Sequence, residues 1–94
     1  MLEAFVNITK AVLRKSTEGV SGYAPTVYIP SEERFACLDG VPDNVSHEEA
    51  ARGWVSTLGL DGREYVIAYR KQNHVVAEWH RPQLPVDTTV IEGV

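Results

Sequence analysis

The sequence predicts a single small α+β domain, in which about four antiparallel strands form a sheet that one or two helices cover. A helical pattern at residues 47–58 lies between two pairs of strand-like segments. With 94 residues, the chain can bury roughly two thirds of the surface that it exposes when unfolded, so one core suffices. The expected order is a helix or strand, followed by β-β-α-β-β. We place the domain in residues 1–82 and expect residues 83–94 to be a C-terminal tail that either adds a strand or stays loose.

The middle helix carries the clearest local signals. Ser46 stands where an N-cap is needed, and Glu49 follows three residues later, as in a capping box. Apolar residues then recur at helical spacing, at Ala50, Ala51, Trp54, Val55 and Leu58. Gly59 can end the helix in the left-handed conformation. Together these signals predict a helix over residues 47–58.

Beyond this helix the apolar pattern has a period of two, which predicts a β-hairpin over residues 63–80. The more apolar faces of its two strands are Tyr65, Ile67 and Tyr69 on the first and Val75, Ala77 and Trp79 on the second. These sets share one face if the loop between the strands has three residues, 71–73. The predicted pairs are then Tyr69 with Val75, Ile67 with Ala77, and Tyr65 with Trp79. His74 and His80 fall on the opposite face, where His80 pairs with Glu64 at the surface.

A shorter hairpin is predicted before the middle helix, at residues 26–29 and 35–38, around the turn-forming residues 30–33. The first segment, residues 2–15, fits a helix and partly fits a strand. The helix is favoured because Arg14 and Lys15 then lie at the negative end of the helix dipole.

Composition and charge argue against several classes of protein. The net charge is −4, and residues 16–62 carry eight acidic side chains against two arginines, which disfavours nucleic acid as a partner. We find no secretory signal and no apolar run long enough for a membrane span, so we expect a cytoplasmic protein with no membrane partner. The single cysteine, Cys37, cannot form an internal disulfide, and its acidic neighbours favour a buried, inert thiol. No cofactor is predicted.

No catalytic or metal site is predicted. The chain has no glycine-rich phosphate loop, no nucleophile elbow and no zinc-binding spacing. His74 and His80 lie six residues apart on one predicted strand, about 20 Å at the usual rise, so they cannot hold one ion. Asp39, Asp43 and His47 fit turn positions better than metal ligands.

Two functions from different classes remain open. The leading hypothesis is a non-enzymatic interaction or regulatory module whose partner is itself or another protein. It self-associates through the outer hairpin face, where an apolar centre of Val66, Ala68 and Val76 is surrounded by Arg70, His74 and Glu78. This surface is available only if the segment 2–15 does not cover it. The alternative is a small-molecule-binding domain or minor enzyme, with a pocket between helix and sheet lined by Trp54, Tyr65, Tyr69 and Trp79.

Overall fold

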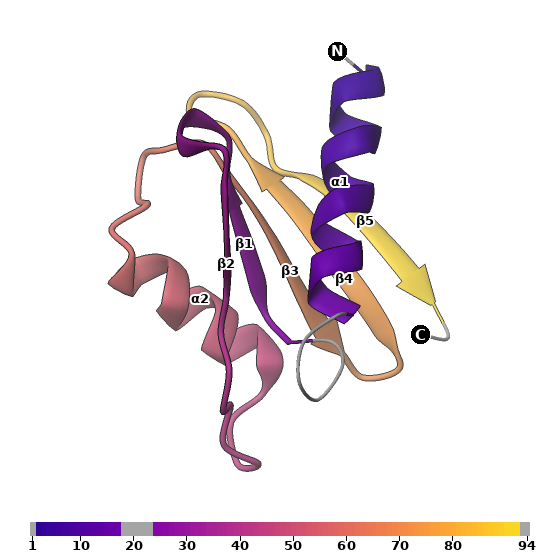
Figure 1. The fold of residues 1–94 in the computed structure, drawn as a ribbon, viewed down its shortest axis with the longest axis vertical. Helices are drawn as coiled ribbons and strands as arrows, with labels where there is room; N and C mark the ends of the chain where they lie inside the picture. Colours follow the sequence, from indigo (N-terminus) through magenta and orange to yellow (C-terminus); the bar gives the residue numbers. More distant parts are fainter. Residues whose placement is uncertain (1, 18–23, 93–94) are drawn as a thin grey trace.

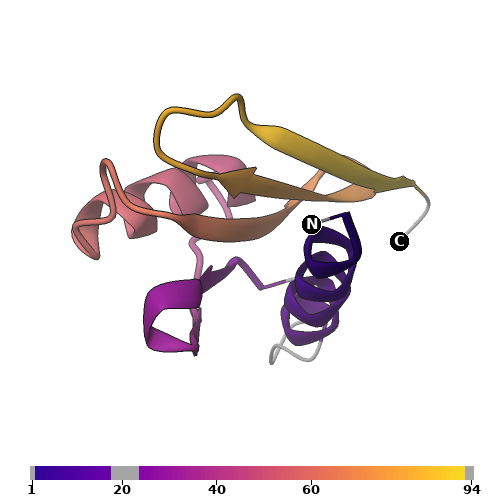
Figure 2. The same cartoon turned by 90° about the horizontal axis from the view of Figure 1, so that it is seen from above.

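The computed structural model describes residues 2–17 and 24–92, which form one antiparallel sheet with a helix on each side (Figures 1 and 2). The elements in chain order are α1 (Leu2–Thr17), β1 (Thr26–Ile29), the short 3-10 helix η1 (Pro30–Glu32), β2 (Arg34–Cys37), α2 (His47–Thr57), β3 (Tyr65–Lys71), β4 (His74–His80) and β5 (Asp87–Glu92). The strands lie in the order β2-β1-β3-β4-β5, and all neighbours are antiparallel. The predicted α+β class is confirmed, with five strands where about four were expected.

The helix α1 covers one face of the sheet, where it packs mainly on β1, β3 and β4. Its Val12 and Leu13 are buried in a cluster with side chains from β3 and β4, namely Val66, Ala68, Val75, Ala77 and Trp79. The helical prediction for the first segment is therefore correct. This helix also occupies the face of Val66 and Ala68 that we considered for contact with another chain.

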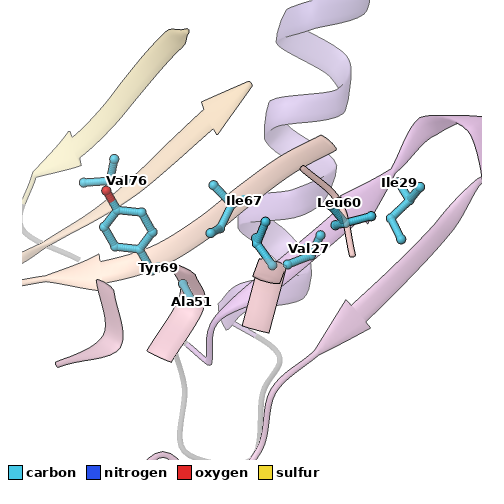
Figure 3. Close-up of a cluster of buried hydrophobic side chains, with 8 residues drawn as sticks. Val27, Ile29, Ala51, Leu60, Ile67, Tyr69 and Val76 are labelled. Carbon is cyan, nitrogen blue, oxygen red and sulfur yellow. The ribbon is translucent and has the colours of Figure 1, made fainter. Parts of the chain in front are cut away.

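The helix α2 lies on the other side of the sheet and packs mainly on β3 and β1 (Figure 2). It begins as predicted, because the Ser46 hydroxyl accepts a hydrogen bond from the Glu49 backbone N–H at 3.1 Å. Gly59 follows the helix with φ +69°, the left-handed conformation that a glycine adopts without strain. Figure 3 shows the cluster beneath α2, built from Val27, Ile29, Ala51, Val55, Leu60, Ile67, Tyr69 and Val76.

The register predicted for the second hairpin is wrong by one residue. The loop has two residues, Gln72 and Asn73, and Tyr69 lies opposite Val76 while Tyr65 lies opposite His80. Gln72 takes the left-handed position of the turn, with φ +56°. The tyrosines of β3 therefore share a face with the histidines of β4, and Trp79 lies on the opposite face. Hydrophobic patterning fixes a register when one face of a hairpin is wet, but here each face contributes buried side chains to a core cluster.

The C-terminal segment adds a strand, which is one of the two outcomes considered for residues 83–94. β5 pairs with β4 from His74 opposite Glu92 to Trp79 opposite Asp87, and it forms an edge of the sheet. Neither described helix is both long and apolar enough to cross a membrane.

Candidate functional site

The six residues of the predicted interface do not form one surface. Val66 and Ala68 are fully buried against α1, and Arg70 follows them on that face but is exposed. Val76, Glu78 and His74 lie on the other face of the hairpin, where Val76 and Glu78 are buried. The one-residue error in register is the reason, because it places the two halves of the set on opposite sides of the sheet.

The α2 side of β4 instead carries a buried polar network around Glu78, which the sequence did not lead us to expect. Glu78 is only 6% exposed, and its carboxylate accepts hydrogen bonds from the Tyr69 hydroxyl at 2.5 Å and from His80 Nε2 at 2.8 Å. Arg52 of α2 donates to both carboxylate oxygens, at 3.0 and 3.3 Å. We call these four residues the Glu78 network. It ties α2 to the two central strands.

The electrostatics of the network follow from these contacts. Burial by itself raises the pKa of Glu78, but the hydrogen bonds from Tyr69, Arg52 and His80 outweigh burial and hold that pKa below its ordinary value. Burial, together with the hydrogen bond to Glu78, raises the pKa of the Tyr69 hydroxyl. The carboxylate is therefore charged and the phenol neutral at neutral pH, as the donor and acceptor roles require.

The groups of the Glu78 network are occupied by contacts within the fold. Both carboxylate oxygens already accept hydrogen bonds, and Tyr69 and Glu78 are buried among packed side chains. A general acid or base must come within hydrogen-bonding distance of a substrate, and these two groups have no open approach. Of the four residues, only Arg52 and His80 have appreciable exposure.

The four aromatic residues of the predicted pocket are also divided between the two faces. Tyr69 belongs to the core beneath α2, and Trp54 and Tyr65 pack at its margin. Trp79 lies in the α1 cluster, where its indole N–H donates to Glu64 at 2.9 Å. A single pocket lined by all four residues is therefore wrong, and the predicted pairing of Glu64 with His80 is replaced by the bond to Trp79.

A hollow of about 180 Å³ lies where β3 begins and β4 ends. Its lining residues are Asp61, Gly62, Arg63, Tyr65, His80, Arg81, Pro82 and Val86. The rings of Tyr65 and His80 stack there with centroids 4.5 Å apart. Tyr65 is the one residue of the predicted pocket that lines this hollow.

The most exposed apolar surface lies along β5 and the loop before it. Five large apolar side chains of the described residues are exposed, and four of them lie between residues 84 and 91. We call these four, Leu84, Val86, Val90 and Ile91, the β5 patch. The other edge strand, β2, has four residues and carries the exposed Arg34 and the exposed Cys37. The prediction that Cys37 is buried is wrong, because an edge strand leaves one of its sides open to solvent.

The part of the chain that the structure describes contains no group of three or more side chains arranged to hold a metal ion. No protein-family model, curated protein or solved structure gives a significant match to this chain.

Proposed function

We propose that the protein is a non-enzymatic interaction module that self-associates through β5. The observation that carries this proposal is the exposure of Val90 and Ile91 on the two faces of a strand with one unpaired edge, with Leu84 and Val86 exposed in the loop before it. An edge strand presents a row of N–H and C=O groups that can pair with another strand. We propose no reaction.

The sequence of β5 favours pairing. Its six residues, Asp87–Glu92, include two threonines, a valine and an isoleucine, which are strong strand formers. Natural edge strands are usually protected from pairing by lysine, proline or a bulge, and β5 has neither lysine nor proline. Its acidic residues stand only at its two ends.

A second copy of the chain is the partner that fits this edge. Two antiparallel strands related by a two-fold axis place one residue opposite its own copy. A register centred on Val90 brings the two Val90 side chains together and places Thr89 opposite Ile91 of the second copy. In any two-fold register the numbers of opposed residues add up to an even number, so Asp87 never directly faces Glu92 of the second copy. Pairing thus covers the apolar centre of β5 without placing acid directly opposite acid.

The proposal is tested by measuring the mass of the protein in solution over a range of concentrations, by light scattering after size-exclusion chromatography. We expect the 10.4 kDa chain to approach twice that mass as concentration rises. Association should strengthen with added salt, because each chain carries a net charge of −4 and the two copies repel.

The variant Val90→Lys places a charge at the centre of the edge and is expected to give a monomer with an unchanged circular dichroism spectrum. Val6→Lys is the matched control, because Val6 is also an exposed valine, 38% against 49% for Val90, but lies on α1. A wild-type chain that stays monomeric at millimolar concentration would refute the proposal. Equal effects of the two substitutions would refute the role of β5.

We further propose that the protein works in the cytoplasm. The support is the exposed, unpaired thiol of Cys37, since such thiols persist in reducing compartments and are readily oxidised outside them. An interaction module of this kind carries no cofactor in our proposal.

A further inference from the structure

The hollow at the end of β3 and β4 gathers nitrogen donors at one place. Arg63, His80 and Arg81 line it, and Asp61 is the only acidic residue among its described lining residues. Tyr65, Pro82 and Val86 supply a less polar wall. Such a mixture of a small apolar wall and convergent polar groups is typical of sites for small ligands.

Arg63 has donors left over for a ligand. Its contacts within the described residues go through one terminal nitrogen, Nη2, which donates to the Ser31 hydroxyl at 3.0 Å and to the Glu32 carboxylate at 3.1 Å. The side chain is 42% exposed. The guanidinium group is therefore held in position from one side, while its Nη1 and Nε donors remain for an acceptor in the hollow.

Arg81 is held in place even more firmly. Its guanidinium carbon lies 4.8 Å from the centre of the Trp79 ring, and Nη2 donates to the Asp87 carboxylate. Its Nε is buried and has no hydrogen-bond partner among the described residues. A group fixed in this way loses little conformational freedom when a ligand arrives.

His80 is oriented by the Glu78 network. Its Nε2 lies 2.8 Å from the Glu78 carboxylate, and its ring stacks on Tyr65 at an interplanar angle of 10°. Because a carboxylate can only accept, Nε2 carries the hydrogen, and Nδ1 is the ring nitrogen that has no partner among the described residues. The ring is therefore a fixed part of the wall of the hollow.

We propose that this hollow binds a small oxyanion, a phosphate or carboxylate group, with Arg63 as its main contact and the unpartnered Nε–H of Arg81 as a second donor. Planar guanidinium groups match the oxygen geometry of both anions, which favours an oxyanion over a spherical ion such as chloride. The hollow, with a volume of about 180 Å³, has room for one phosphate or carboxylate group. The proposal does not rest on the self-association proposed above, but the two sites share Val86, which lines the hollow and belongs to the β5 patch.

Neighbouring acids keep this site weak for a free anion. Arg81 already pairs with Asp87, Arg63 shares Glu32 with Arg34, and Asp61 lines the hollow. We therefore expect dissociation constants in about the millimolar range, which corresponds to roughly 4 kcal/mol of binding free energy.

The experiment is a titration of the ¹⁵N-labelled protein with inorganic phosphate and, separately, with acetate, followed by NMR. Sodium chloride keeps the ionic strength constant. We expect saturable shifts confined to the amides of residues 61–65, 80 and 81. Shifts with both anions identify a carboxylate as sufficient, and shifts with phosphate alone identify the phosphoryl group. No saturation with either anion, or the same shifts on adding chloride, would overturn the proposal.

Two arginine variants assign the binding to the hollow. Arg63→Gln is expected to weaken phosphate binding at least fivefold, because it removes the charge that faces the anion. Arg34→Gln is the matched control, since Arg34 also pairs with Glu32 but does not line the hollow. Equal affinities of the two variants would show that the anion does not bind at Arg63.

Discussion

Replacing Glu78 by glutamine tests whether the Glu78 network holds α2 on the sheet. The substitution keeps the size of the side chain but removes the charge that Arg52, Tyr69 and His80 share. One carboxylate oxygen, which accepts hydrogen bonds, is replaced by an amide N–H₂ group, which can only donate. This group faces the donors of Arg52, Tyr69 or His80. At least one of these donors then loses its partner in a buried place.

The cost follows from the contacts. Breaking a buried ion pair costs about 3–5 kcal/mol, and one hydrogen bond to a charged group contributes about 1.5–3 kcal/mol. Arg52 is 47% exposed, so water compensates for part of its loss. We therefore expect Glu78→Gln to lower the free energy of unfolding by about 2–4 kcal/mol at pH 7. With a urea m-value of about 1 kcal/mol/M, the unfolding midpoint falls by about 2–4 M.

The assay is urea unfolding followed by tryptophan fluorescence, with Glu49→Gln as the control. Glu49 is an exposed glutamate on α2, the helix that carries Arg52, and its substitution is expected to change stability by no more than about 0.5 kcal/mol. If Glu78→Gln does not fold, Tyr69→Phe removes one donor alone and is expected to cost about 1–2 kcal/mol. Glu78→Gln and Tyr69→Phe both matching the control would refute the reasoning.

The pH dependence gives the same prediction a second readout. The pKa of Glu78 is lower in the folded protein than its ordinary value of 4.5. Its contribution to stability is therefore fully present above that ordinary value and is lost as pH falls through the lowered one. The wild type should lose stability more steeply below pH 4.5 than Glu78→Gln. Parallel curves between pH 7 and pH 3 would contradict an ionised Glu78 in the native state.

Two further outcomes are expected. Gln72→Gly should stabilise the protein by about 0.5–1 kcal/mol, because Gln72 holds the left-handed position of the two-residue turn. Asn73→Gly should not stabilise the protein. A higher urea midpoint for Asn73→Gly than for Gln72→Gly would contradict the two-residue loop and favour the predicted loop of residues 71–73. Cys37 should react with a thiol reagent in the native protein at nearly the rate of the unfolded chain, because it is exposed on β2. A reaction that waits for unfolding would contradict this exposure.

Local signals were enough to predict most of the elements. The Ser46 cap and the Gly59 stop gave α2 to within a residue, and the alternating segments gave β3 and β4. The register between β3 and β4 could not be derived from the pattern. Either register leaves apolar side chains on both faces of the hairpin, and both faces are buried in the structure. The fate of residues 83–94 was equally open, since a β-prone tail becomes a strand only if a sheet edge is within reach.

The Glu78 network shows why buried sites are harder to predict than elements. Arg52 and Glu78 are 26 residues apart and meet only because α2 packs across the sheet. One signal was available, since Glu78 stands within the apolar run from Val75 to Trp79 and must find a partner wherever that run is buried on both faces. The predicted register placed Glu78 on the outer face and so removed the need for a partner.

On the α2 side, the helix covers only part of the sheet, and both Glu78 and the proposed interface lie beyond the strands that it covers. α1 packs on four strands of the sheet, β1, β2, β3 and β4, whereas α2 packs mainly on β3 and β1 (Figure 2). On β4 a side chain provides the cover, because Arg52 extends from α2 and donates hydrogen bonds to Glu78. On β5 nothing in the described chain does the same, and Val90 remains half exposed. A substitution that abolishes self-association should therefore leave the Glu78 network intact, because the single chain already completes the cover as far as β4.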